Sequence, residues 1–211
     1  ASMENSARAA GVEIHCGAKI ARIDVTKGSA VGVTLDDGRV FTANTVFSSA
    51  DPKTTFLNLA GPRVLETGFV RAVSNIRMKG DAARLFLALD KVPQFKGLPP
   101  TALAGRMVIA PSSDYVDWAF NPSKYGELAA APAMEITVQS IMDTSMAPTG
   151  KAVLSVTLQH CPYDLKAGWE TGRSLLTETA LNLLERYAPG IKSSVIASEL
   201  LAPPDIEKRC N

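Results

Sequence analysis

Three short runs of β-branched and alternating residues early in the chain constrain its fold more than any other feature. They span Lys19 to Val25, Ala30 to Leu35 and Val40 to Thr42. Polar tetrads that contain glycine separate them, Thr26-Lys27-Gly28-Ser29 and Asp36-Asp37-Gly38-Arg39, and such tetrads are typical of hairpin turns. This spacing predicts an antiparallel β-meander with tight, polar tips.

Segments on both sides of the meander predict further helix and strand. Glu4 to Ala10 has a helical pattern closed by a glycine, and Val12 to Ile14 then alternates in the manner of a strand. After the meander, Thr45 to Phe47 is predicted as a short strand that ends at the turn Ser48 to Pro52. Within that turn, Asp51 is placed to cap a helix whose first turn contains the proline.

The remainder of the chain combines strand patterns with helical ones. Strands are predicted over Ala83 to Leu89, Arg106 to Ala110, Met134 to Ile141, Ala152 to His160 and Ser194 to Leu201. Helical patterns cover Val64 to Asn75, Asp114 to Phe120 and Gly172 to Tyr187. Because turn formers join the strands at 134–141 and 152–160, we expect these two strands to pair in antiparallel. The helix at 172–187 should cover one face of their sheet.

These elements predict an α+β fold of mixed α/β content, in which a β-meander is followed by a mixed, largely antiparallel sheet backed by helices. The chain has 211 residues, of which 46% are hydrophobic, enough to bury one sizeable core or two small ones. Beyond Gly61-Pro62 the pattern of the sequence changes. We therefore expect a domain boundary near Phe56.

Charge and cysteine content exclude several classes of function. Lysine and arginine number 22 against 21 acidic residues, with no run of like charge, which argues against a nucleic-acid partner. The three cysteines form no C-x-x-C pair, so neither a disulfide framework nor a structural metal site is expected. No stretch approaches the length of about 20 apolar residues that a membrane span requires. We expect a protein without a transmembrane segment, intracellular, and either cytoplasmic in a bacterium or in the mitochondrial matrix of a eukaryote.

Motifs for nucleotide binding and hydrolysis are absent from the sequence. It contains no G-x-G-x-x-G, Walker, H-E-x-x-H or G-x-S-x-G pattern, so we do not expect the chain to hold a dinucleotide pyrophosphate by a glycine-rich turn. His15 and His160 each precede a cysteine. Neighbouring residues on a strand point to opposite faces, so neither pair is interpreted as a nucleophile dyad. Both histidines are interpreted as ordinary strand residues.

Two further groups of side chains have a functional and a structural interpretation. Asp36 and Asp37 precede a glycine in a predicted turn, where aspartate favours local hydrogen bonds, and this interpretation outweighs a role as paired carboxylates. Tyr115 and Trp118 lie in an irregular stretch from Lys91 to Pro132 that is rich in proline and glycine. An aromatic cluster in such a stretch either lines an apolar ligand pocket or packs in the core.

Residues 11–52 resemble the central part of phytoene-desaturase-like flavoproteins. The resemblance rests on the ordered series GVEIHCGAKIARIDVTKGSAVGVTLDDGRVFTANTVFSSADP. Later stretches are similar to a narrower branch, the pyridine nucleotide-disulfide oxidoreductase domain-containing protein 2 group. These stretches are SIMDTSMAPTGKAVLSV at 140–156, YDLKAGWE at 163–170 and APPDIE at 202–207. The resemblance covers nearly the whole chain.

The resemblance implies a domain organisation. In this family a glycine-rich turn near the N-terminus holds the FAD pyrophosphate, and a glycine-rich segment near the C-terminus closes over the flavin. The sequence contains neither, so the resemblance implies an internal fragment. It implies a partial FAD-binding domain over residues 1–55, a substrate-binding domain over 56–203 and the start of the return to the FAD-binding domain over 204–211.

The resemblance implies cofactor contacts at few residues. Ile20 matches the position where strand backbone lies beside the adenine, and it equally fits a buried strand isoleucine. Ser48, Ala50 and Asp51 match the turn that approaches the cofactor, where free amides at a helix start suit a polar or anionic ligand; a plain helix cap is the alternative. The branch often has a histidine where this sequence has Lys151 and the alanine after it. No catalytic acid or base therefore carries over, and no metal ligand is expected.

The resemblance implies that the intact protein is an FAD-dependent oxidoreductase, whose flavin accepts a hydride from an apolar small-molecule substrate. The fragment by itself is expected to be inactive and to bind no FAD. The alternative function is a self-contained module that binds an apolar ligand without catalysis. A third hypothesis is an interaction protein, because open strand edges and apolar patches promote self-association.

Overall fold

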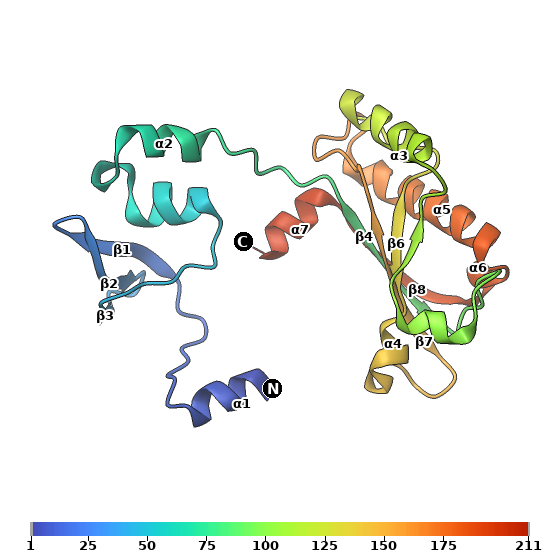
Figure 1. Ribbon diagram of the computed structural model, residues 1–211, viewed down its shortest axis with the longest axis horizontal. Helices are drawn as coiled ribbons and strands as arrows, with labels where there is room; N and C mark the ends of the chain where they lie inside the picture. Colours follow the sequence, from blue (N-terminus) through green and yellow to red (C-terminus); the bar gives the residue numbers. More distant parts are fainter. Residues whose placement is uncertain (1, 211) are drawn as a thin grey trace. The chain divides into compact units, whose positions relative to one another are not determined.

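The structure of the protein, a computed structural model, describes residues 2–210 and divides the chain into two compact units (Figure 1). Unit 1 extends to Met78, and unit 2 begins at Lys79. The helices between residues 53 and 74 belong with the meander in unit 1, so the chain passes from one unit to the other later than residue 55. The assignment of residues 1–55, 56–203 and 204–211 to parts of an FAD-binding and a substrate-binding domain stays a prediction.

The predicted β-meander is confirmed in unit 1. Strands β1 (Ile20–Thr26), β2 (Ser29–Leu35) and β3 (Val40–Thr42) form an antiparallel sheet in the order β1-β2-β3. The two residues of the first turn, Lys27-Gly28, have φ angles of 51° and 79°, and a hairpin loop of this kind requires positive φ at both positions. The predicted helix before the sheet is present as α1 (Ser2–Ala9).

Three helices follow the meander in unit 1. They are η1 (Lys53–Ala60), which is a π-helix, the short η2 (Pro62–Val64) and α2 (Thr67–Ser74). The prediction of one helix from Val64 to Asn75 is wrong at its start, because Leu65 is extended with φ of −112° and ψ of 153°. An extended residue interrupts the helical hydrogen-bond ladder, so two helices replace one.

Two predicted strands of unit 1 are wrong. Val12 to Ile14 and Thr45 to Phe47 do not adopt strand conformation. Their sequences favour a strand, but a strand forms only where a neighbouring backbone completes its hydrogen bonds. Within residues 2–210, the three-stranded sheet contains β1, β2 and β3 alone and pairs with neither segment.

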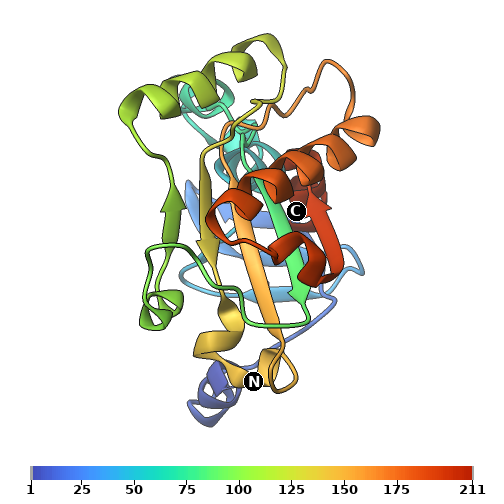
Figure 2. The same cartoon turned by 90° about the vertical axis from the view of Figure 1, so that its right-hand side faces the viewer.

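A five-stranded sheet forms the centre of unit 2 (Figure 1, Figure 2). Its strands are β4 (Ala83–Leu89), β5 (Met107–Ile109), β6 (Met134–Thr137), β7 (Ala152–Leu158) and β8 (Val195–Leu201), in the order β5-β6-β7-β4-β8. Each neighbouring pair is antiparallel, and β6 and β7 are neighbours as predicted. The predicted fold class, helices backing a largely antiparallel sheet, is confirmed.

Helices connect and cover the strands of unit 2. The longest is α5 (Trp169–Tyr187), which begins slightly before the predicted helix. The others are η3 (Pro100–Ala104), α3 (Ser113–Phe120), η4 (Asn121–Tyr125), α4 (Gln139–Met142), η5 (Thr144–Met146), α6 (Ile191–Ser194) and α7 (Pro203–Cys210). The predicted strand from Met134 to Ile141 is too long, because the chain turns into α4 after Val138. Among residues 2–210, no helix combines the length and the apolar character that crossing a membrane requires.

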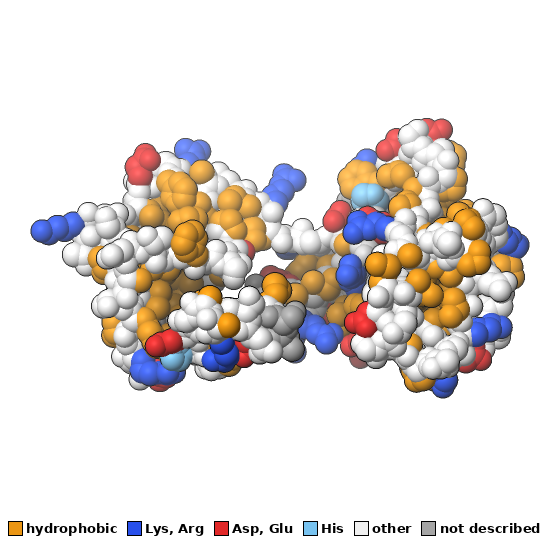
Figure 3. Space-filling view, turned by 60° about the horizontal axis from the view of Figure 1, so that its bottom comes forward, with side chains coloured by type: hydrophobic (Ala, Val, Ile, Leu, Met, Phe, Trp, Pro, Cys, Tyr) orange, Lys and Arg blue, Asp and Glu red, His pale blue; other side chains and the backbone are white. Residues whose placement is uncertain are grey.

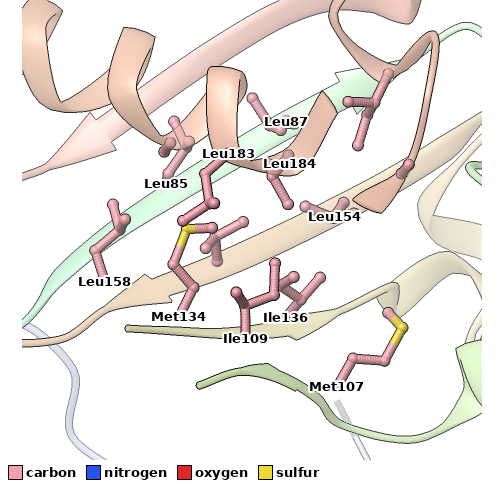
Figure 4. Close-up of a cluster of buried hydrophobic side chains, with 14 of the residues drawn as sticks. Leu85, Leu87, Met107, Ile109, Met134, Ile136, Leu154, Leu158, Leu183 and Leu184 are labelled. Carbon is pink, nitrogen blue, oxygen red and sulfur yellow. The ribbon is translucent and has the colours of Figure 1, made fainter. Parts of the chain in front are cut away.

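The core of unit 2 lies between α5 and one face of the sheet (Figure 2). Every second residue of β4, from Ala83 to Leu89, is buried, because side chains alternate between the two faces of a strand. Leu176, Ala180 and Leu184 of α5 are fully buried and recur at the spacing of one helix face. Figure 4 shows Leu184 directed toward the strands, among the buried leucines of the sheet. The prediction that this helix covers one face of the sheet is confirmed.

Candidate functional site

Two neighbouring hollows in unit 1 bring together three of the residues predicted to lie near a cofactor. The larger hollow, of about 460 Å³, is lined by Ser48 and Ala50 among others, and the smaller, of about 350 Å³, by Ile20 and Ser48. Ile23 and Val46 also line both. No charged side chain is among the lining residues of either hollow. These surroundings suit a neutral ring or an apolar group better than a phosphate.

The turn that begins at Ser48 is held together by its own side chains. The Asp51 carboxylate accepts hydrogen bonds from the amides of Lys53 at 2.8 Å and Thr54 at 3.0 Å, so Asp51 caps η1 as predicted. The Ser48 hydroxyl accepts a hydrogen bond from the Ala50 amide at 3.3 Å. Acceptors within the turn therefore satisfy the amides of Ala50, Lys53 and Thr54. A role of Ser48, Ala50 and Asp51 near a cofactor stays a prediction.

Replacing Asp51 by alanine is expected to destabilise η1 by about 0.5–2 kcal/mol, the usual cost of removing a helix cap. Hydrogen bonds from Thr54 and from the Lys53 amide hold the pKa of Asp51 below its usual range. The stabilisation is therefore complete above the ordinary pKa of aspartate and is lost as the pH falls through the folded-state pKa. Amide hydrogen exchange within η1, at pH 7 and at pH 3, measures the change.

Asp51→Asn is the matched control, because asparagine keeps a capping oxygen without a titratable charge. The η1 amides of this variant should remain close to wild type at pH 7 and should show no additional loss of protection at pH 3. If both variants lose the same protection at pH 7, the side-chain oxygen does not form the cap.

Ile20 begins β1 and is half-buried. Its backbone pairs with Leu35 of β2, and the register of the two strands shifts between Ile20 and Arg22. Its side chain lines the smaller hollow together with Phe41. This placement fits a strand isoleucine, and the predicted contact of its backbone with an adenine stays a prediction.

The two histidines lie outside strands, contrary to prediction. His15 precedes β1 and packs against Phe41 in a tilted arrangement, with ring centroids 5.1 Å apart. His160 follows β7 at a bend with φ of 60° and packs against Phe120, with ring centroids 5.0 Å apart. Its buried Nδ1 makes no hydrogen bond to the described residues and lies 3.6 Å from the Asp81 carboxylate. In the part of the chain that the structure describes, no group of three or more histidine, cysteine and acidic side chains is placed to hold a metal ion.

Cys161 is expected to resist alkylation in the native protein, whereas Cys16 and Cys210 should react. Cys161 is buried, and burial raises the pKa of its thiol to about 12; the other two are exposed. Because the thiolate is the reactive form, iodoacetamide at pH 8 should label Cys161 only after denaturant is added. Mass spectrometry of proteolytic digests measures the labelling. Rapid native labelling of Cys161 would show that the segment after β7 opens readily.

The aromatic pair of α3 is divided between two environments. Tyr115 donates a hydrogen bond from its hydroxyl to the Pro132 carbonyl oxygen at 3.2 Å. Its ring packs on a small cluster of buried alanines, Ala119, Ala129 and Ala133. Trp118 is 69% exposed. Tyr115 thus fits the core-packing interpretation, and a pocket role for the pair stays a prediction.

A hollow of about 540 Å³ in unit 2 was not predicted from the sequence. Leu128, Leu165 and Leu175 provide apolar lining, and Lys166 and Thr171 are among its polar residues. This volume is within the range of small-molecule sites. The hollow therefore has the size and the lining for an apolar ligand.

Gly172 shapes this hollow from within α5. A Cβ atom at this position would lie 2.2 Å from Leu165 Cδ2, so the glycine allows Leu165 to pack against the helix. A glycine inside a helix costs about 1 kcal/mol relative to alanine. Its presence in the helical pattern is the sequence signal that points to this close approach.

The sheet face opposite α5 carries hydrogen-bonded polar side chains. Arg84 donates to the Thr157 hydroxyl at 3.0 Å, and the Thr137 and Ser155 hydroxyls lie 2.9 Å apart. These residues alternate with the buried apolar ones along their strands, so they point away from the core. The same face also carries half-buried apolar side chains, among them Phe86 and Val153, so it is polar only in part.

Curated proteins of greater length are similar to this chain, although no family model matches it. The chain is 31% identical to pyridine nucleotide-disulfide oxidoreductase domain-containing protein 2 of Mus musculus, with 98% of this chain and 38% of the mouse protein covered. It is 26% identical to phytoene desaturase (lycopene-forming) of Pseudescherichia vulneris, with 92% of this chain and 38% of the bacterial protein covered. The chain thus spans about 38% of the length of these relatives.

A solved structure shares the fold. The crystal structure of an oxidoreductase from Methanosarcina mazei matches with a TM-score of 0.60 at 18% identity, covering 95% of this chain and 40% of that chain. The curated relatives are named as oxidoreductase or desaturase proteins, in agreement with the similarity expected from residues 11–52 and from the later stretches. The predicted resemblance is therefore confirmed: over nearly its whole length, the chain is similar to phytoene-desaturase-like oxidoreductases.

Proposed function

We propose that the chain is part of a longer FAD-dependent oxidoreductase, in which unit 2 positions an apolar small-molecule substrate for hydride transfer to the flavin. The observation that carries the proposal is the similarity to oxidoreductase and desaturase relatives along 98% and 92% of the chain. The hollow lined by Leu128, Leu165 and Leu175 supports an apolar substrate. Within the proposal, bound FAD supplies the two-electron acceptor, and the protein residues bind and orient.

The residues of unit 1 fit a neutral part of the cofactor. The hollows beside Ile20, Ser48 and Ala50 have no charged lining residue, and the amides at the start of η1 are occupied by Asp51. A pyrophosphate needs free amides or cations, so within this proposal it binds to residues outside this chain. The Ser48 hydroxyl and the β1 backbone are the groups that would face a neutral ring. The chain by itself is then inactive and free of FAD.

We further propose that the protein acts inside the cell, in the bacterial cytoplasm or in the mitochondrial matrix. The exposed thiols of Cys16 and Cys210 support this proposal, because exposed free thiols persist in reducing compartments.

The visible absorption spectrum tests the proposed function. Protein from the complete reading frame should carry flavin absorption bands and release FAD on denaturation, whereas the 211-residue chain should be colourless. A folded complete protein that contains no flavin after purification and does not bind added FAD would refute the proposal.

A self-contained module for an apolar ligand is the second candidate function. It is favoured by the unit 2 hollow, since all of its lining residues lie within one unit. The fluorescence of 1-anilinonaphthalene-8-sulfonate, titrated with the 211-residue chain and with Leu175→Glu, tests this function. A module predicts saturable binding that the variant abolishes, together with a complete protein that lacks flavin.

A further inference from the structure

The charged residues within the five strands of unit 2 all lie on the sheet face opposite α5. They are Arg84 of β4, Glu135 of β6 and Glu199 of β8. Arg84 and Glu135 alternate with fully buried core residues of their strands, and Glu199 is the register partner of Phe86 on the same face. Because side chains alternate between the two faces of a strand, all three project away from the core.

Arg84 differs from the other two charged residues because it has no partner of opposite charge. Glu135 pairs with Arg106 at 2.9 Å, and Glu199 pairs with Arg209 at 3.8 Å. Within residues 2–210, the guanidinium of Arg84 forms no ion pair with a carboxylate. The face therefore carries one positive charge that the described side chains do not neutralise.

A neighbouring hydroxyl holds the Arg84 guanidinium on this face. Arg84 lies opposite Thr157 in the register of β4 and β7, and its Nη1 donates a hydrogen bond to the Thr157 hydroxyl at 3.0 Å. Among the described residues, this is the one hydrogen bond that the five N–H donors of this guanidinium make. A guanidinium presents its donors as a planar fork that matches a carboxylate. Arg84 thus has the donors for a bidentate bond to an anion.

Apolar side chains continue the face in one direction from Arg84. The next two rows along β4 and β7 place Phe86 opposite Ser155 and Ala88 opposite Val153. Phe86 and Val153 are half-buried. Residues of one face recur about 7 Å apart along a strand. An apolar chain could therefore lie over both rows while its charged end reaches Arg84.

The backbone of the sheet favours a carboxylate over a phosphate. Phosphate sites use free backbone amides, at helix N-termini or in loops, and often several cations. The strand β4 pairs with β7 on one side and with β8 on the other, so its amides are engaged in the sheet. The net charge of the chain is +1, and Figure 3 shows basic and acidic side chains interspersed on the surface in view. No broad positive field therefore attracts polyanions.

We propose that the sheet face opposite α5 binds a small organic acid with an apolar chain. Its carboxylate pairs with Arg84, and its chain lies on Phe86 and Val153. None of these three residues lines the unit 2 hollow, so the proposed site is a second one, beyond the apolar ligand of the proposed function. Binding at this site transfers no electrons, and the inference does not depend on flavin.

Titration of the 211-residue chain with octanoate, followed by the chemical shifts of the backbone amides, tests the proposal. The shifts should saturate and should be largest at Arg84, Phe86 and Thr157. Octanamide has the same chain without the charge, and it should bind at least about tenfold more weakly, because the charge-assisted hydrogen bonds are lost. Equal affinities for octanoate and octanamide, or no saturable shifts in β4 and β7, would overturn the proposal. Tighter binding of octyl phosphate than of octanoate would refute the choice of a carboxylate.

Arg84→Gln provides a second readout, with Arg106→Gln as the matched control. Both arginines are exposed, so both variants should fold. Arg84→Gln should weaken octanoate binding at least about tenfold without changing octanamide binding, and Arg84→Lys, which keeps the charge but not the fork, should recover part of the affinity. Arg106→Gln should change octanoate binding less than about twofold, because Arg106 already pairs with Glu135. Equal losses in the two glutamine variants would contradict the assignment to Arg84. If Arg84→Gln does not fold, the comparison of octanoate with octanamide on the unchanged chain decides.

Discussion

Replacing Leu184 by alanine is expected to lower the free energy of unfolding of unit 2 by about 2–5 kcal/mol. Leu184 is fully buried in α5 and belongs to the core between this helix and the sheet (Figure 4). The loss combines the transfer free energy of the removed carbons with the cavity they leave. Both tryptophans, Trp118 and Trp169, lie in unit 2, so urea unfolding followed by tryptophan fluorescence reports this unit alone.

Leu175→Ala is the matched control on the same helix. Leu175 is 57% exposed, and its truncation should change the free energy of unfolding by less than about 0.5 kcal/mol. The two variants remove the same atoms from two positions of the same helix, so their difference isolates burial. Similar losses for Leu175→Ala and Leu184→Ala would mean that α5 presents a different face to the sheet.

Gly32→Ala is expected to destabilise unit 1 by about 1–3 kcal/mol and to disrupt the pairing of β2 with β3. A Cβ atom at this position would lie 2.2 Å from the Phe41 carbonyl oxygen, and this obstacle is backbone, which a rotamer change does not move. The φ angle of 156° adds strain for a residue with a side chain. Since Gly32 pairs with Thr42, exchange of the β2 and β3 amides measures the loss.

Gly28→Ala separates the clash from the backbone strain. Gly28 has φ of 79° in the first hairpin turn, and nothing lies within 4 Å of the Cβ that alanine would add. Its replacement should cost about 1–2 kcal/mol, the strain of a left-handed residue alone, and should affect β1 and β2 rather than β3. If Gly32→Ala leaves the β3 amides as protected as Gly28→Ala does, the close approach of β2 and β3 is not as described.

The elements that the sequence predicted well are those whose signals are local. The meander was predicted because each turn carries glycine where the backbone needs positive φ, as at Lys27-Gly28. The long helix was predicted from its helical pattern over residues 172–187, and tertiary packing then buried Leu176, Ala180 and Leu184 on one face of it. The Asp51 cap was predicted in the same way, because its acceptor and the amides it satisfies lie within three residues of one another.

The candidate sites were predicted less well, since they depend on residues distant in the sequence. Ser48 lines both hollows of unit 1, whereas Ile20 lines the smaller and Ala50 the larger. The amides of Ala50, Lys53 and Thr54 are satisfied by Ser48 and Asp51. One local sequence signal pointed to the unit 2 hollow, namely the glycine within α5. Residues 126–128 and residues at the start of that helix both line the hollow. No periodic sequence pattern connects these two segments, which are distant along the chain.

The sequence by itself determined which segments favour a strand, a turn or the long helix, and it determined the resemblance to phytoene-desaturase-like proteins, because both depend on contiguous residues. Only the tertiary structure decided which strand-forming segments become strands. Val12 to Ile14 and Thr45 to Phe47 have suitable residues but no partner among the described strands, whereas Ala83 to Leu89 has a neighbour on each side. The physical reason is that a helix completes its hydrogen bonds within one segment, and a strand must obtain them from another.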